Sequence, residues 1–143
     1  DTVTGARGME VTMDEKLSEI DDQCDLVVLP GGIPGVPNLK TNSKVQAMVK
    51  AQNDRGGYVA AICAGPTALG AFGVLADKNA TCYPGCEDQL MAKRHSTEPV
   101  VVDGNVITSR GVGTAIEFAL KLVEILIDRQ TADDLAEKIV YKR

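Results

Sequence analysis

Two short apolar runs constrain the fold of this chain more than any other feature. DLVVLPGG (25–32) is a β-branched run that ends in Pro-Gly-Gly, and YVAAIC (58–63) is a second run without a charged residue. Neither run alternates apolar with polar residues, so both predict strands that are buried on two faces. Helical patterns separate and follow these runs. Such an alternation predicts an α/β sandwich with a mainly parallel sheet.

The other elements follow from hydrophobic period and turn residues. Helices are predicted over TNSKVQAMVKAQNDRGG (41–57), PTALGAFGVL (66–75), GTAIEFALKLVEILID (113–128) and the final segment 131–141. The helix at 113–128 has apolar stripes on two sides, so we expect it to lie between the sheet and either the final helix or a partner subunit. VVVDGNVITS (100–109) predicts a hairpin that turns at Asp103-Gly104.

Composition excludes several classes of function. The 143 residues predict one domain, and the net charge of −5 comes without a basic tract, which argues against nucleic-acid and anionic-membrane partners. No apolar run approaches the roughly 20 residues of a membrane span, and no signal-peptide pattern opens the chain. The cytoplasm is therefore the expected location.

The cysteines do not predict a metal site. Cys24, Cys63, Cys82 and Cys86 lack the paired spacing of a zinc site, and the chain has a single histidine, His95, in a polar stretch where we expect it to be solvated. Cys82 and Cys86 flank a Pro-Gly turn that would bring two thiols close. In a reducing compartment the preferred interpretation is that these thiols are unrelated.

Cys63 stands where the second apolar run passes directly into a predicted helix. This is the pattern of a nucleophile elbow, in which a sharp turn exposes the side chain and directs backbone N–H groups at the group it attacks. The amino terminus of a helix also favours a thiolate, the nucleophilic and oxidisable form of cysteine. Gly31 and Gly32, after the first run, would supply an oxyanion-binding N–H. The alternative is that Cys63 is a small buried core residue.

Four segments together carry a family resemblance. DLVVLPGG, AAICAGPTAL, ITSRGVGTAIEFAL and the ARG near the start resemble the ThiJ/PfpI superfamily, and most closely its parkinsonism-associated deglycase branch. The resemblance implies a flavodoxin-like three-layer sandwich, a homodimer and a reactive elbow cysteine. It also implies a cofactor-free glyoxalase or deglycase activity on α-oxoaldehydes such as methylglyoxal, and reversible cysteine oxidation in stress defence.

The resemblance assigns roles to particular residues of this chain. It makes Cys63 the nucleophile, and it implies an oxyanion side lined by the backbone amides of Gly31, Gly32 and Ala64. Arg7 matches an arginine that in relatives lies at the dimer interface near the cysteine, and Gly111 and Gly113 match a loop near the pocket. Without the resemblance, Arg7 would be read as a surface charge and the glycines as turn residues.

Several residues differ from the motifs of related families, and these differences argue against some classes of enzyme. Tyr83 stands where many members of the branch have histidine, and a phenol is a poor base near neutral pH. Ala64 follows the cysteine where the protease-like branch has histidine, which argues against a PfpI-type peptidase. Glutamine amidotransferases have a His-x-Glu pair late in the chain. This sequence has no such pair, which argues against a glutamine amidotransferase.

The start of the chain also departs from the family pattern. Asp1 follows no Met, whereas the resemblance implies a first βαβ unit before the ARG segment and a glutamate on its helix that hydrogen-bonds the cysteine. We therefore expect residues 1–143 to form a single ThiJ/PfpI-type domain that is incomplete at its N-terminus, with the acid/base carboxylate in the absent segment. We expect these residues alone to fold poorly.

Two functions compete on the same residue. The first is an enzyme whose Cys63 thiolate adds to the aldehyde of an α-oxoaldehyde and releases a hydroxy acid such as lactate. The second is a non-enzymatic oxidative-stress sensor or redox-regulated chaperone that works through oxidation of Cys63. Turnover of methylglyoxal distinguishes them.

Overall fold

A four-stranded sheet forms the centre of the computed structural model, which describes residues 2–20 and 23–142 and therefore excludes Asp1. The strand order is β3 (Leu26–Leu29), β4 (Tyr58–Ile62), β8 (Val106–Ser109) and β7 (Val100–Asp103). β3 pairs parallel with β4 and β4 pairs parallel with β8, whereas β7 is antiparallel to β8. The prediction of a mainly parallel α/β sheet is confirmed.

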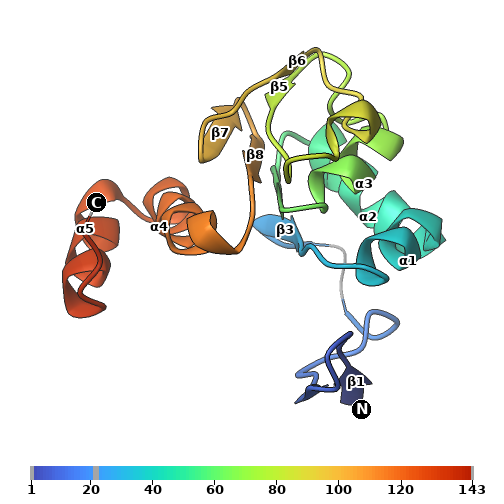
Figure 1. The fold of residues 1–143 in the computed structure, drawn as a ribbon, viewed down its shortest axis with the longest axis horizontal. Coiled ribbons are helices and arrows are strands. Elements are labelled where there is room, and N and C mark those ends of the chain that lie inside the picture. Colours follow the sequence, from blue (N-terminus) through green and yellow to red (C-terminus); the bar gives the residue numbers. More distant parts are fainter. Residues whose placement is uncertain (1, 21–22, 143) are drawn as a thin grey trace.

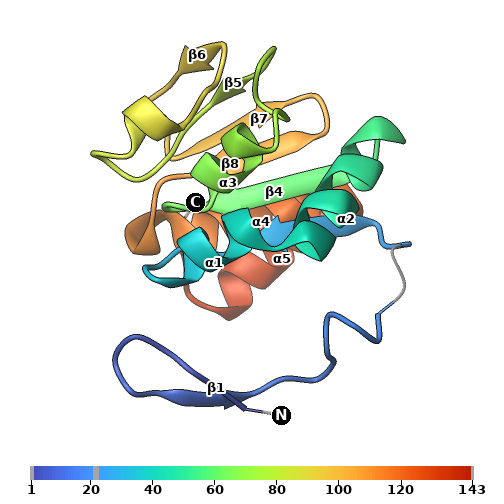
Figure 2. The ribbon, with the colours of Figure 1, turned by 90° about the vertical axis from the view of Figure 1, so that its right-hand side faces the viewer.

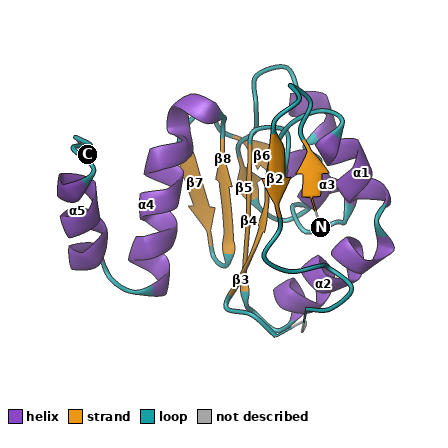
Figure 3. Cartoon of the chain, turned by 90° about the horizontal axis from the view of Figure 1, so that it is seen from below, coloured by secondary structure: helices purple, strands orange, loops and turns teal. Residues whose placement is uncertain are grey.

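Helices cover both faces of this sheet (Figure 3). One face carries α1 (Gly35–Thr41), α2 (Ser43–Asp54) and α3 (Pro66–Ala71). The other face carries α4 (Ala115–Leu126), and α5 (Arg129–Lys138) packs on the outer side of α4. The helix predicted at 113–128 therefore lies between the sheet and the final helix, as its two apolar stripes indicate.

The lack of polar residues in β4 follows from this arrangement. Val59 and Ala61 are buried in the core that α1, α2 and α3 share with the sheet. Ala60 points to the opposite face and packs with Ile107 and Phe118 in a second core beneath α4. Because successive side chains of a strand alternate between faces, a strand covered on both sides must be apolar throughout.

Local signals explain α2, whereas α1 was not predicted. The Asn42 side chain accepts hydrogen bonds from the backbone N–H groups of Lys44 and Val45, at 3.0 and 3.1 Å, and so caps α2. α1 has seven residues, includes a proline and has no side-chain cap. Burial of Val36 in the core holds it in place.

The predicted hairpin is present at β7 and β8. Its turn passes through Gly104, whose φ of 62° lies in the left-handed region that suits glycine. Smaller elements surround it: β5 (Asn79–Ala80), β6 (Arg94–His95), and two 3-10 helices at Glu87–Gln89 and Val112–Thr114. β5 pairs parallel with β6, and His95 is exposed as expected.

The first residues form a separate hairpin. β1 (Thr2–Thr4) pairs antiparallel with β2 (Glu10–Thr12), and this hairpin lies apart from the central sheet (Figures 1 and 2). The sequence did not predict it. Its apolar side chains, among them Val3, Met9 and Val11, are exposed.

Candidate functional site

Cys63 occupies a sharp turn at the carboxyl end of β4. Its φ of 65° is in the left-handed region, which non-glycine residues rarely adopt. The Cys63 N–H donates to the carbonyl of Ser109 at 3.0 Å, and the Cys63 carbonyl accepts from the N–H of Tyr83 at 2.8 Å. Three residues, 63–65, connect β4 to α3, rather than the single residue that the sequence suggested. The turn is thus fixed on both sides by neighbouring backbone.

Two glycines make room for this turn. A Cβ on Gly65 would lie 2.6 Å from the carbonyl oxygen of Leu29 and 2.9 Å from that of Ile62. A Cβ on Gly31 would lie 2.6 Å from the Cβ of Cys63 and 3.1 Å from its Sγ. Such separations are shorter than van der Waals contact allows, so Gly31 and the Cys63 side chain lie directly against each other.

Backbone donors around Cys63 are available for a ligand. Among residues 2–20 and 23–142, no group accepts a hydrogen bond from the N–H of Gly31, Gly32 or Ala64. Within the same residues, no side chain hydrogen-bonds the Cys63 sulfur. Uncommitted N–H groups beside a nucleophile can stabilise an oxyanion that forms on the group it attacks.

The loop after β8 packs against Tyr83, the residue that hydrogen-bonds the Cys63 carbonyl. A Cβ on Gly111 would lie 3.3 Å from Cδ2 of Tyr83, so the tyrosine ring packs on this glycine. Thr114 Oγ1 accepts from the Gly111 N–H at 3.1 Å and lies 2.7 Å from Ser109 Oγ. A shallow pocket of about 380 Å³ is lined by Tyr83, Pro84, Arg110, Gly111, Val112, Gly113 and Thr114.

The four thiols differ in their surroundings. Burial raises the pKa of the fully buried Cys82 thiol to about 11. Burial also raises the pKa of Cys86, which remains partly accessible. Cys24 is exposed, and its Sγ lies 3.9 Å from Oε1 of Gln52, just before β3 and at the opposite end of the parallel strands from the Cys63 turn. Cys63 combines partial exposure with a strained backbone.

The predicted site residues do not all lie together. The structure brings Gly31 against Cys63, with Gly32 and Ala64 next in sequence, and it brings Gly111 to Cys63 through Tyr83. Gly113 lines the shallow pocket beside Gly111. Arg7 is exposed in the turn between β1 and β2, and within one chain that hairpin lies apart from the sheet (Figure 2).

Two side chains near the site were not predicted. Arg110 lines the shallow pocket, donates from Nη1 to the carbonyl of Thr97 at 3.4 Å, and its buried Nε has no partner among the described residues. Cys86 lies close enough to Cys63 that charge on the Cys63 sulfur contributes to its raised pKa. The position of Arg110 within SRGVGT was a signal for it, whereas no sequence signal placed Cys86 near Cys63.

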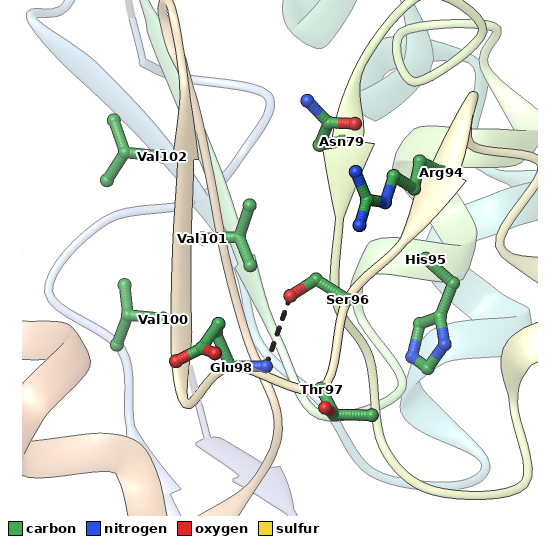
Figure 4. A pocket seen from close by; sticks show the side chains of 9 residues that line it. All are labelled: Asn79, Arg94, His95, Ser96, Thr97, Glu98, Val100, Val101 and Val102. Carbon is green, nitrogen blue, oxygen red and sulfur yellow. Dashed lines mark hydrogen bonds between the residues drawn. The ribbon is translucent and has the colours of Figure 1, made fainter.

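A separate cleft lies between β6 and β7 (Figure 4). It has a volume of about 560 Å³ and is lined by Asn79, Arg94, His95, Ser96, Thr97, Glu98, Val100, Val101 and Val102. The one hydrogen bond drawn there runs from the Glu98 N–H to Ser96 Oγ, at 3.2 Å. None of these residues was predicted for the site, and the cleft holds no thiol.

The described residues contain neither a metal-binding cluster nor a membrane-spanning helix. No group of three or more His, Cys, Asp or Glu side chains in residues 2–20 and 23–142 is arranged to hold a metal ion. In the same part of the chain, every helix is too short or too polar to cross a bilayer.

Comparison with known proteins gives consistent matches. The model of the DJ-1/PfpI family matches residues 1–125. The Parkinson disease protein 7 homolog of Danio rerio is 41% identical over 155 residues, which cover 99% of this chain and 82% of that protein. The glutathione-independent glyoxalase DJR-1.2 of Caenorhabditis elegans is 35% identical over 137 residues, covering 94% of this chain and 73% of that protein.

A solved structure has a similar fold. The crystal structure of Drosophila melanogaster DJ-1beta superposes with a TM-score of 0.94 and 37% sequence identity, covering 100% of this chain and 78% of that chain.

Proposed function

Because this chain belongs to the DJ-1/PfpI family, we propose that it is a cofactor-free, cysteine-dependent stress-response enzyme that acts on α-oxoaldehydes, converting methylglyoxal to lactate. One observation carries the proposal: Cys63 is held at positive φ against Gly31, beside N–H groups that have no acceptor among the described residues. The name of the Caenorhabditis elegans relative, a glutathione-independent glyoxalase, supports the same chemistry.

The reaction begins with the sulfur of Cys63. Its thiolate adds to the aldehyde carbon of methylglyoxal, and the carbonyl oxygen becomes the hydroxyl of a hemithioacetal. Transfer of the hydrogen from the former aldehyde carbon to the neighbouring carbonyl carbon then gives a lactoyl thioester. Water hydrolyses the thioester, which releases lactate and the free thiol. The aldehyde is oxidised and the ketone reduced within one molecule, so the overall reaction needs no external electron acceptor.

The described residues have definite roles in this scheme. The N–H groups of Gly31, Gly32 and Ala64 would bind the oxyanion that forms when the thiolate adds. Gly111 and Gly113 shape the wall that faces Tyr83. Tyr83 donates its backbone N–H to Cys63 and so fixes the turn, a role that does not require its phenol to act as a base.

The partner and location follow from the same proposal. We propose a homodimer in which Arg7 of one subunit approaches Cys63 of the other, because the hairpin that carries Arg7 lies apart from the central sheet of its own chain (Figure 2). Four unpaired thiols suit a reducing compartment, and we propose the cytoplasm.

A second function uses the same N–H groups. Donors that stabilise an oxyanion also stabilise the oxygens of an oxidised cysteine, so Cys63 is suited to a sensor that responds to peroxide without turnover. A solved relative, Toxoplasma gondii DJ-1, is described as oxidized; it superposes with a TM-score of 0.94 and 34% identity, covering 99% of this chain and 78% of that chain.

Lactate formation from methylglyoxal tests the choice between these functions. The protein expressed from its complete gene should release many equivalents of lactate per chain without glutathione or any other cofactor. Cys63→Ala should remove that activity, while Cys24→Ala, which changes a thiol remote from the turn, should keep it. A single stoichiometric adduct on the wild-type protein, with no further lactate, would support the sensor and contradict the enzyme.

A further inference from the structure

Cys63 is not the only thiol at its end of the sheet. The carbonyl of Cys63 accepts from the N–H of Tyr83, and the carbonyl of Tyr83 accepts from the N–H of Cys86 at 3.0 Å. The second bond closes a tight turn over Tyr83, Pro84, Gly85 and Cys86. Two successive backbone hydrogen bonds therefore connect the backbone of Cys86 to that of Cys63, although 22 residues separate them in sequence.

The electrostatic interactions agree with this placement. After burial, charge on Cys63 is the strongest influence that raises the pKa of Cys86. Such influences act only between groups that lie near each other. Cys63 and Cys86 also raise the pKa of Cys82, so the three thiols form one cluster.

Accessibility distinguishes Cys86 from Cys82 within this cluster. Cys82 is fully buried between β5 and the turn, and its sulfur has little freedom to move. Cys86 packs against the core but keeps part of its surface in solvent. Gly85, immediately before it, has a φ of 94°, a conformation that suits glycine. Because glycine has no side chain, the turn carries none at that point.

We propose that Cys86 is the resolving thiol of Cys63 and that the two form a reversible intramolecular disulfide when a hydroperoxide oxidises Cys63. The proposal rests on the proposed function in one respect: it requires that Cys63 is the reactive thiol. It adds a redox role to a residue that the enzymatic scheme does not use.

The steps balance with hydrogen peroxide as the oxidant. The Cys63 sulfur attacks one peroxide oxygen, the O–O bond breaks, and the hydroxide that leaves takes up a proton to become water. The product is a sulfenic acid. The Cys86 sulfur then attacks the Cys63 sulfur, the S–O bond breaks, and hydroxide leaves with the Cys86 proton as a second water. The two thiols lose two electrons and the peroxide gains two. A dithiol reductant restores both thiols by exchange.

The disulfide would limit damage to the site. A sulfenic acid that meets no thiol is oxidised further to sulfinic acid, which simple thiols do not reduce. Closure of the Cys63–Cys86 bond competes with that step. It also blocks the nucleophile, so activity on an aldehyde would stop under peroxide and return on reduction.

Peptide mapping under non-reducing conditions tests the proposal. The complete protein is treated with a slight excess of hydrogen peroxide, unreacted thiols are alkylated, and the linked peptides are identified. We expect a linked pair that contains Cys63 and Cys86, an intact mass lower by two hydrogens in a single chain, and full reversal by dithiothreitol. The Cys86→Ser variant should lose the link and accumulate Cys63 with two added oxygens. The matched Cys82→Ser variant should keep the link.

The outcomes separate this inference from the proposed function. Equal accumulation of sulfinic acid on Cys63 in the wild-type protein and in Cys86→Ser would overturn the resolving role while leaving Cys63 reactive. A link between Cys63 and Cys82 would also overturn it. If peroxide leaves Cys63 untouched, the inference is wrong, whereas the proposed function is decided separately by lactate formation from methylglyoxal. The alkylation rate of Cys63 before oxidation should be the same in wild type and Cys86→Ser, which shows that the variant keeps the fold of the turn.

Discussion

At the scale of single residues, the site depends on how the backbone of Cys63 is held. A non-glycine residue at positive φ costs about 1–3 kcal/mol and persists only where its surroundings determine it. Here the hydrogen bonds to Ser109 and Tyr83 fix the turn, and Gly31 leaves space for the side chain. A strained conformation of this kind directs the side chain away from the end of the strand and toward a ligand. A cysteine that only filled the core would not need such a conformation.

Gly31→Ala tests this dependence. The added methyl group would overlap the Cys63 side chain and must displace it, so we expect methylglyoxal turnover to fall by about 10- to 100-fold, as is usual for a nucleophile moved by a fraction of an ångström or more. Steady-state kinetics on purified variants measures the effect. Gly35→Ala is the matched control, because nothing lies within 4 Å of its added Cβ. Equal losses in both variants would show that Gly31 has no special relation to Cys63.

At this scale, the sequence predicts those features of the site whose signal is local. Cys63 and its flanking small residues form a continuous pattern, and Gly31 follows the neighbouring strand at a matching position. The packing of Tyr83 on Gly111 and the approach of Cys86 to Cys63 join residues more than 20 positions apart. No periodicity or short motif reports such contacts, because they depend on how loops fold over the end of the sheet.

At the scale of elements, one buried polar side chain joins α2 to the start of the sheet. Gln52 is almost completely buried, and its Nε2 donates to the carbonyls of Cys24 and Asp25 at 3.1 Å and of Tyr58 at 3.2 Å. These carbonyls lie just before β3 and at the first residue of β4. Gln52 therefore holds together the ends of two parallel strands that share no turn.

Gln52→Ala should destabilise the protein by about 2–3 kcal/mol, because it leaves buried carbonyls without donors and opens a cavity. Urea unfolding followed by circular dichroism provides the measurement. Gln46→Ala, on the same helix and without a side-chain hydrogen bond to any described residue, should change stability by no more than about 0.5 kcal/mol. A similar small change at Gln52 would contradict the bridging role.

The elements that the sequence did not predict are those with weak local signals. α1 contains Pro37 and lacks a capping side chain, and it forms because Val36 is buried and the Val36 N–H donates to the carbonyl of Gly32. β5 and β6 have two residues each, too few to show an alternation. The long or strongly apolar elements (α2, α4, β3 and β4) were predicted because their patterns repeat over several turns or fill both faces of the sheet.

At the scale of the whole molecule, the hairpin of β1 and β2 points to a partner. Val3, Met9 and Val11 are 55%, 72% and 48% exposed, and two short strands with exposed apolar side chains are marginally stable alone. A second copy of the chain would cover these side chains. It would also bring Arg7 of one subunit toward Cys63 of the other, as the proposed homodimer requires.

Sedimentation equilibrium measures this association. We expect a species of twice the chain mass that dissociates on dilution, and we expect Met9→Asp to shift it toward the monomer because the variant places a charge in the apolar contact. Val102→Asp, at a comparably exposed residue of the edge strand β7, should leave the association unchanged. A wild-type species of the single-chain mass at every concentration would contradict the homodimer.

The rate of alkylation of each thiol in the folded protein tests the central claim, that Cys63 is the nucleophile, most directly. Brief treatment with iodoacetamide at neutral pH, followed by peptide mapping, should label Cys63 first, and methylglyoxal should slow that labelling. Cys82 should react only after unfolding, because burial raises its pKa to about 11. Faster labelling of Cys24, Cys82 or Cys86 than of Cys63 in the folded protein would contradict the account.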